Sequence, residues 1–201
     1  MLLEPEDSQL VLVDYQARLM PVIFEGGLVA ANAVRLAQMA RAMEVPAWGT
    51  EQNPAKLGEN LPELRALCSR TLAKMHFSAC ADGLSEWLRP APKAPQGNAR
   101  SLPKHLQKAV PQAAAQRNTI VIAGCEAHVC LLQTALDLLD EEFDVWVVTD
   151  ACSSRTERNR DAAFDRLAGA GAELVTTEMV AFEWLRTADH PAFRQMQGLI
   201  K

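Results

Sequence analysis

The sequence predicts a single doubly wound α/β domain, with a mostly parallel six-stranded sheet and helices on both faces. Short apolar runs of the kind found in strands buried on both sides alternate with longer segments of helical periodicity. This alternation is typical of parallel sheets, and right-handed crossovers then limit the possible topologies. The chain has 201 residues, enough for one well-buried domain and short for two. We find no internal repeat and assign residues 1–201 to one domain.

Six short segments rich in apolar and β-branched residues are expected to form the strands. They lie at residues 9–14, 45–50, 71–74, 119–124, 144–150 and 173–177. The segment 119–124 (Thr-Ile-Val-Ile-Ala-Gly) is the clearest, because it is β-branched throughout its centre and closed by a glycine. The segment 71–74 fits a loop as well as a strand, and we favour the strand. Residues 51–54 (Glu-Gln-Asn-Pro) are expected to form a turn.

The segments between these strands show the spacing of covering helices. In residues 28–43, apolar side chains recur on one helical face. Further helices are expected after Ser78 through Leu88, over 104–116, after Gly124, and over 156–168 and 178–187. Residues 90–103 hold four prolines and are expected to form a loop. This loop either covers the site, contributes an oligomer contact, or is simply solvated.

Composition and charge exclude several classes of partner. The net charge is −5, and lysines and arginines are scattered among acidic residues, so we expect no nucleic-acid partner. The N-terminus lacks the basic and then apolar pattern of a secretory signal. No run approaches the roughly 20 apolar residues that span a bilayer, so we expect no membrane partner. A cytoplasmic protein is the expectation.

The cysteines are expected to be free thiols. There are five, at positions 68, 80, 125, 130 and 152, an odd number without a repeating spacing. None forms a Cys-x-x-Cys pair, and no second Cys/His pair completes a zinc site. We therefore expect neither a metal nor a cofactor.

Three chemically capable residues fall at expected strand ends: Asp14, Lys74 and Cys130. Ligands of open α/β sheets bind outside the carboxyl ends of the strands. Taken singly, these residues have ordinary explanations as a turn cap, a solvated charge and a small hydrophobe. Together they can form a nucleophilic site, in which a carboxylate takes the thiol proton. A helix start and a nearby lysine are expected to lower the pKa of the Cys130 thiol.

These segments resemble the isochorismatase-like cysteine hydrolases. Residues 124–138 (Gly-Cys-Glu-Ala-His-Val-Cys-Leu-Leu-Gln-Thr-Ala-Leu-Asp-Leu) are similar to the family's nucleophile segment. Residues 12–16 resemble its first-strand motif with the catalytic aspartate, and 72–78 resemble the segment of its catalytic lysine. Residues 150–155 and 50–52 are further family-like segments, the latter resembling the isochorismatase domain-containing branch. The resemblance runs from about residue 9 to 199.

The resemblance implies roles for further residues. It implies Asp14, Lys74 and Cys130 as a catalytic triad, and a cis peptide between Cys125 and Glu126. It also implies that the backbone N–H groups of Glu126 and Cys130 form an oxyanion hole. Metal-binding relatives carry Asp-x-His after the second strand, where this chain has Thr50-Glu51-Gln52-Asn53, so their metal site is expected to be absent.

We therefore expect a hydrolase that acts on a small-molecule substrate, cleaving a small amide or related C–N bond. Tyr15, Gln16, Gln52 and Phe77 are the expected substrate-binding residues. Two alternatives stay open: hydrolysis of a vinyl ether, as in the isochorismatases that give the family its name, and a binding or scaffold protein without activity. A nucleotide-binding domain is disfavoured, because no glycine-rich loop follows the first strand.

We also expect a homo-oligomer. Members of the family commonly assemble, and the C-terminal segment 178–200 is rich in large apolar side chains that need a surface to cover them. These are Phe182, Trp184, Leu185, Phe193, Met196, Leu199 and Ile200. The alternative is that they close the last helix onto their own sheet.

Overall fold

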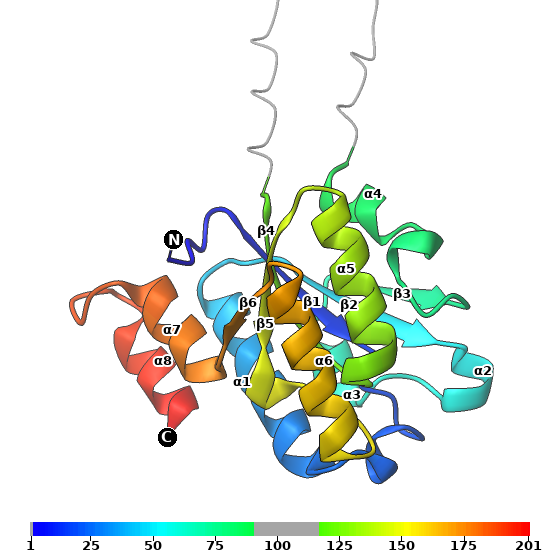
Figure 1. Ribbon diagram of the computed structural model, residues 1–201. Helices are drawn as coiled ribbons and strands as arrows, with labels where there is room; N and C mark the ends of the chain where they lie inside the picture. The colour runs from blue at the N-terminus through cyan, green and yellow to red at the C-terminus, as the bar shows by residue number, and fades with distance from the viewer. Residues whose placement is uncertain (1, 91–116) are drawn as a thin grey trace, which may run out of the picture.

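The computed structural model describes residues 2–90 and 117–201 and shows one six-stranded sheet with helices on both faces (Figure 1). The strand order is β3-β2-β1-β4-β5-β6, and every neighbouring pair is parallel. The chain thus starts in the middle of the sheet, builds outward to β3, and returns to build the other half. The order reverses between β1 and β4, which is where doubly wound sheets bind ligands.

All six strands form near the expected positions. They are β1 (Ser8–Val13), β2 (Ala47–Gln52), β3 (Arg70–Lys74), β4 (Thr119–Gly124), β5 (Asp144–Val148) and β6 (Glu173–Val175). Every residue of β1 and β4 is buried, as expected of central strands covered on both faces. The doubly wound parallel sheet that the sequence predicts is therefore confirmed.

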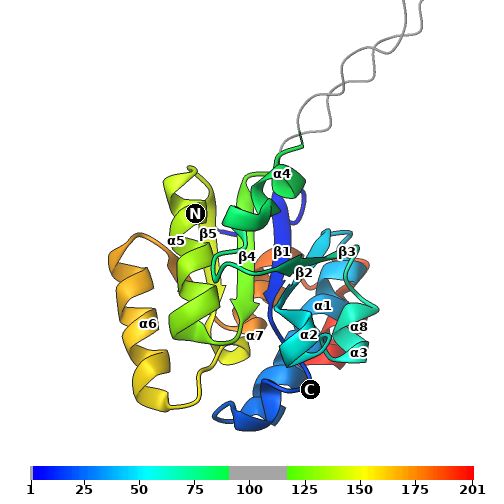
Figure 2. The ribbon, with the colours of Figure 1, turned by 90° about the vertical axis from the view of Figure 1, so that its right-hand side faces the viewer.

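The helices form two layers. Those of the described residues are α1 (Gly26–Ala42), α2 (Pro54–Leu57), α3 (Pro62–Arg65), α4 (Leu84–Leu88), α5 (Leu132–Asp140), α6 (Glu157–Gly169), α7 (Thr177–Leu185) and α8 (Phe193–Ile200). Helices α5 and α6 cover one face, and α1 and α8 lie on the other (Figure 2). Helix α7 packs against α1 and α8.

Several element boundaries differ from the expectation. The turn expected at residues 51–54 is wrong for Glu51 and Gln52, which extend β2 because they pair with Ala73 and Lys74 of β3. The last strands end earlier than expected, at Val148 and Val175. The short helices α2 and α3 and the terminal α8 were not predicted. The proline-rich loop beyond residue 90 and the helix expected at 104–116 lie outside the described residues.

The apolar C-terminal segment mostly closes onto its own domain. Trp184, Leu185 and Met196 are buried, and Phe193 packs against the same core. Phe182 remains 47% exposed. Most of this segment thus follows the alternative of packing within one chain. None of the helices in the described parts of the chain has the length and apolar character needed to cross a membrane.

Candidate active site

Asp14 stands at the carboxyl end of β1, where the chain leaves the sheet. Its backbone φ is 55°, in the left-handed region that non-glycine residues seldom adopt. The carboxyl group is fully buried, and its Oδ1 accepts a hydrogen bond of 2.7 Å from the Thr50 hydroxyl of β2. The sheet register explains this contact, because Val13 pairs with Thr50. Thr50 is a supporting residue whose role the sequence did not indicate.

Lys74, the last residue of β3, forms a buried ion pair with Asp14. Its Nζ lies 2.8 Å from Asp14 Oδ2, and neither side chain is exposed. Nζ also donates to Gln52 Oε1 (2.8 Å) and to the Phe77 carbonyl (3.0 Å). The contact with Asp14 is not aligned as a hydrogen bond, so Oδ2 accepts none from the described residues. A buried charge pair needs such additional partners to offset its desolvation.

Cys130 completes the cluster from the other half of the sheet. It lies in a π-helical turn (Ala127–Leu131) that follows β4 and precedes α5, and its side chain is buried. Burial, and next the charge of Asp14, raise the pKa of this thiol to about 12, while Lys74 opposes the rise. The expectation of a lowered pKa is therefore wrong. Desolvation of the thiolate outweighs the nearby lysine.

Gln52 joins the cluster, and the side chain of Gln16 holds the backbone of Gln52 in place. Gln52 Oε1 accepts from Lys74 and lies 3.9 Å from Cys130 Sγ. Behind it, Gln16 Oε1 accepts from the Gln52 backbone N–H (2.9 Å), and Gln16 Nε2 donates to the Gln52 carbonyl (3.0 Å). Gln16 is fully buried. It therefore supports Gln52, in place of the direct substrate contact that the sequence suggested.

The other two expected substrate-binding residues have different positions. Tyr15 is fully buried, and its hydroxyl donates to the Ala151 carbonyl at 2.5 Å. The prediction that Tyr15 binds substrate is therefore corrected: its side chain lies in the hydrophobic core. Phe77 reaches the cluster through its carbonyl, which accepts from Lys74, while its side chain is 52% exposed.

The segment that bears the expected oxyanion hole is braced by the segment that follows β5. The peptide between Cys125 and Glu126 is cis, as the resemblance implies. Ala127 donates its N–H to the Ser153 carbonyl at 2.8 Å, and Arg155 Nε pairs with Glu126 Oε2 at 2.9 Å. Through these contacts, residues 150–155 hold the turn that leads into Cys130.

The loop after β3 is tied to the helix that follows Cys130. The Ser78 hydroxyl donates to Asp137 Oδ2 at 2.5 Å, and the Ala79 N–H donates to Thr134 Oγ1 at 3.0 Å. Both acceptors lie in α5. The motifs around Lys74 and around Cys130 are thus parts of one assembly, which fixes the lysine relative to the thiol. The sequence showed both motifs but not the bonds between them.

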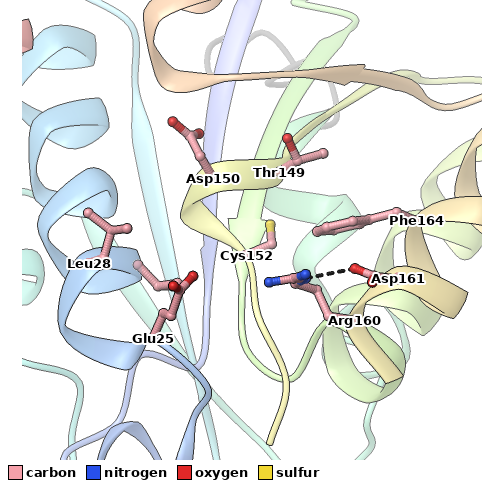
Figure 3. Close-up of a pocket in the computed structure, with 9 residues that line it drawn as sticks. Glu25, Leu28, Thr149, Asp150, Cys152, Arg160, Asp161 and Phe164 are labelled. Atoms are coloured by element: carbon pink, nitrogen blue, oxygen red, sulfur yellow. Dashed lines mark hydrogen bonds and ion pairs between the residues drawn. The ribbon is translucent and has the colours of Figure 1, made fainter. Parts of the chain in front are cut away.

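A separate cleft of about 360 Å³ lies between the start of α1 and α6, beyond the end of β5 (Figure 3). Its lining includes Glu25, Arg160 and Phe164 but none of Asp14, Lys74 and Cys130. Arg160 is already paired with Asp161 at 2.8 Å, and Asp150 accepts from the Thr177 N–H at 2.8 Å. Because Arg160, Asp161 and Asp150 already have partners within the protein, we assign no ligand to this cleft.

The last two residues of β2, where metal-binding relatives were expected to differ, make contacts within the protein. Glu51 accepts from the Asn60 N–H at 2.8 Å, and Gln52 is bonded to Lys74. Across residues 2–90 and 117–201, no group of three His, Cys, Asp or Glu side chains is placed to hold a metal ion.

Fold and site together define a doubly wound α/β protein with a buried Cys–Asp–Lys cluster at the switch point of its sheet. The isochorismatase domain model matches residues 104–179. Isochorismatase domain-containing protein 2A of Mus musculus is 36% identical over 197 residues, covering 98% of this chain and 84% of the mouse protein. The human isochorismatase domain-containing protein 2 is 35% identical, with the same coverage. The chain belongs to the isochorismatase-like hydrolase family.

Solved structures agree with this assignment. The MAR1 ribonuclease of Caenorhabditis elegans has a TM-score of 0.83 and 30% identity, covering all of this chain and 92% of the worm protein. YcaC of Pseudomonas aeruginosa, solved with hexane-2,5-diol and covalent acrylamide, has a TM-score of 0.79 and 25% identity over 98% of this chain and 91% of its own. YcaC of Escherichia coli, described as an octameric hydrolase of unknown specificity, has a TM-score of 0.76 and 26% identity over 98% of this chain and 95% of its own.

Proposed function

We propose that this protein hydrolyses a small amide or related C–N bond, with Cys130 as the nucleophile, Asp14 as the general base and acid, and Lys74 as the cation that fixes and stabilises the carboxylate. The observation that carries the proposal is the buried ion pair of Asp14 and Lys74, 2.8 Å apart, whose charges both act on the Cys130 thiol. A buried charge pair beside a thiol is costly to maintain for packing alone. A nucleophilic site gives each of the three groups a chemical role.

In the first half-reaction, Asp14 Oδ2 takes the proton of the Cys130 thiol as Sγ attacks the carbonyl carbon. A C–S bond forms, and the carbonyl π electrons move to oxygen, giving an oxyanion that accepts hydrogen bonds from the backbone N–H groups of Glu126 and Cys130 in the proposed mechanism. The oxyanion then collapses, and the C–N bond breaks. Asp14 returns its proton to the leaving nitrogen, so an amine departs and a thioester remains on Cys130.

In the second half-reaction, water replaces the amine. Asp14 takes a proton from water while the water oxygen attacks the thioester carbonyl, again through an oxyanion. Collapse breaks the C–S bond and releases a carboxylic acid, and the sulfur recovers its proton from Asp14. No metal or redox step is needed for this sequence of proton and acyl transfers.

The raised pKa of Cys130 fits a base-assisted mechanism. A thiol with a pKa of about 12 is almost fully protonated at neutral pH, so the attacking thiolate has to form when substrate is bound. Asp14 Oδ2 accepts no hydrogen bond from the described residues and lies in the same cluster, which leaves it able to take that proton.

Two structural neighbours support the chemistry. The Pseudomonas aeruginosa YcaC was solved with covalent acrylamide, which is an electrophilic amide that reacts with nucleophiles such as thiols. The Escherichia coli YcaC is described as a hydrolase. Both are more than 90% covered by this chain.

The test is a screen of small primary and secondary amides with wild-type protein and the Cys130→Ala variant. We expect release of amine or ammonia by the wild type, and its complete loss in the variant. Mass spectrometry of the quenched wild-type reaction should show an acyl adduct on the peptide that contains Cys130. Activity is expected to survive dialysis against a chelator. Turnover that persists in Cys130→Ala would contradict the proposal.

The same panel includes two other substrate classes. A vinyl ether tests the reaction of the isochorismatases, and an RNA oligonucleotide tests the activity named for the worm MAR1 protein. Cleavage of either one by both the wild type and Cys130→Ala, without turnover of any amide, would assign the site to a reaction that does not use the thiol.

A further inference from the structure

The amide group of Gln52 is fixed in one orientation from both of its ends. Nε2 donates to the Met75 carbonyl at 2.8 Å, and Oε1 accepts from Lys74 Nζ at 2.8 Å. A flipped amide would turn its NH₂ group toward the ammonium and its oxygen toward another carbonyl oxygen. The backbone of Gln52 is held as well, through its N–H bond to Gln16 Oε1. The oxygen of this amide therefore always faces the centre of the site.

That oxygen also lies 3.9 Å from Cys130 Sγ, within the range of a hydrogen bond from a thiol. An acceptor in this position stabilises the S–H form and repels a thiolate. A lysine ammonium has three N–H donors, and those of Lys74 are directed to Gln52 Oε1, the Phe77 carbonyl (3.0 Å) and the His76 carbonyl (3.4 Å). Gln52 thus engages a proton of Lys74 that would otherwise be free to stabilise a thiolate.

Few of the described charged or titratable groups act on the Cys130 thiol beside Gln52. Within residues 2–90 and 117–201, those that act on the Cys130 thiol from the elements packed around it are Asp14 after β1, Lys74 at the end of β3, and Cys125 after β4. On its own turn, His128 Nδ1 is engaged with the Ser154 hydroxyl at 2.9 Å. Asp14 opposes the thiolate and Lys74 favours it. Gln52 is the neutral group that contacts both Lys74 and the sulfur.

We infer that Gln52 is a positioning residue that keeps the Cys130 thiol protonated in the ligand-free protein, because its amide oxygen accepts from the thiol and occupies one N–H of Lys74. The thiolate then forms only when Asp14 accepts the proton during attack on a bound substrate. This inference rests on the proposed function in treating Cys130 as the nucleophile. It predicts a thiol that resists adventitious alkylation although it lies in an active site.

The test measures the rate at which iodoacetamide alkylates Cys130 at pH 8, followed peptide by peptide with mass spectrometry. Three variants are compared with the wild type. Gln52→Met removes the acceptor while keeping the side-chain length, and Gln52→Glu keeps the acceptor and adds a negative charge. Gln9→Met is the matched control: Gln9, like Gln52, is a strand glutamine whose side-chain NH₂ donates to backbone carbonyl oxygen, but it lies in β1 and contacts Leu88 and Arg117.

We expect opposite shifts from the two Gln52 variants. Gln52→Met should alkylate at Cys130 about threefold faster or more, because more thiolate forms, although a thiolate of lower pKa is a weaker nucleophile. Gln52→Glu should alkylate at least about threefold more slowly, because its charge disfavours the thiolate. Gln9→Met should match the wild type, and the rates at Cys68 and Cys80 should be the same in all four proteins.

The Gln52→Glu variant tests the inference even if Gln52→Met folds poorly. A loosened structure can only speed up the alkylation of a buried thiol, so a slower rate cannot result from poor folding. A Gln52→Glu rate equal to or above that of the wild type would overturn the inference, as would shifts of both variants in the same direction. The experiment uses no substrate. Its result is therefore independent of whether the amide screen succeeds.

Discussion

Asp14 has two effects on Cys130 that act in opposite directions. Its negative charge is among the causes that raise the pKa of the thiol, so it disfavours a free thiolate. In the proposed mechanism it is also the group that removes the thiol proton during attack. Both effects follow from one buried carboxylate whose Oδ1 is bound by Thr50 and whose Oδ2 faces Lys74. An isosteric substitution that removes only the charge can separate them.

We predict that Asp14→Asn reacts faster with an alkylating reagent and more slowly with a substrate. Without the carboxylate charge, the pKa of Cys130 falls, and Lys74 is left to pair with the thiolate, so alkylation by iodoacetamide at pH 8 should accelerate. Turnover of an amide should fall by about 10²–10⁴-fold, because the base is lost. Peptide-resolved alkylation and product release measure the two effects.

Cys130→Ala serves as the control for both assays, since it should show neither reaction at this position. A loss of alkylation and turnover together in Asp14→Asn would contradict the prediction. It would mean that the carboxylate promotes thiolate formation in the resting protein.

At the scale of elements, the site depends on the close approach of β1 and β4. A Cβ atom on Gly124 would lie 2.4 Å from the Val13 carbonyl oxygen and 2.5 Å from Val13 Cβ. Gly124 pairs with Val13 in the sheet, directly between Asp14 and the turn that carries Cys130. Only glycine allows the two strand ends to lie this close together, so this residue helps to set the separation between Asp14 and Cys130.

We predict that Gly124→Ala destabilises the protein and impairs the site. Two backbones would have to separate, which costs about 1–3 kcal/mol or more in a well-packed interior. Urea unfolding monitored by tryptophan fluorescence gives the free energy of unfolding. The matched control is Gly27→Ala in α1, where an added Cβ meets nothing within 4 Å. That substitution should stabilise the helix by about 0.5–1 kcal/mol. Equal stabilities of the two variants would contradict the prediction.

Local sequence patterns predicted which helices and strands form better than they predicted the residues at which these elements end. β4 was recognisable because its β-branched run ends in glycine, and the face of α1 because apolar residues recur at helical spacing. The extension of β2 through Gln52 could not be predicted in this way. It depends on pairing with β3, a strand whose own sequence was ambiguous, and Glu51-Gln52-Asn53-Pro54 has the local composition of a turn.

In the candidate site, too, local sequence predicted some features, while others depend on contacts between distant parts of the chain. Three strand-end positions led to Asp14, Lys74 and Cys130, because parallel strands bring their carboxyl ends to one edge. The support from Thr50, Gln16 and the Ser78–Asp137 bond depends on register and on contacts far apart in the chain. The direction of the Cys130 pKa shift depends on how completely the thiol is buried, which no local pattern specifies.

At the scale of the whole molecule, a small apolar surface remains uncovered. Leu2, Met179 and Phe182 are 54%, 46% and 47% exposed and line one shallow cleft. We predict that the protein is a homo-oligomer, as the Escherichia coli YcaC is described to be. Light scattering coupled to size-exclusion chromatography should give a mass of two or more times the 22.0 kDa of one chain, across a series of micromolar concentrations. A mass near 22.0 kDa throughout would contradict this.

The buried thiols also set how the stability of the fold depends on pH. Burial raises the pKa of Cys125 and Cys130 to about 12, and those of Cys68 and Cys80 to about 11. It raises that of Cys152 well above its ordinary value. An unfolded thiol titrates near about 8.5. Above that pH the unfolded chain therefore binds fewer protons than the folded protein, and the free energy of unfolding falls as the pH rises.

We predict that the free energy of unfolding is nearly constant with respect to these thiols below about pH 8 and declines steeply between about pH 9 and 11. Each thiol that stays protonated only in the folded state contributes up to about 1.4 kcal/mol per pH unit in that window. Urea unfolding under reducing conditions at closely spaced pH values measures the slope. Cys152→Ala removes one fully buried thiol outside the triad and should make the decline shallower, whereas a stability that rises or stays level from pH 9 to 11 would show that these thiols are not buried as protonated groups.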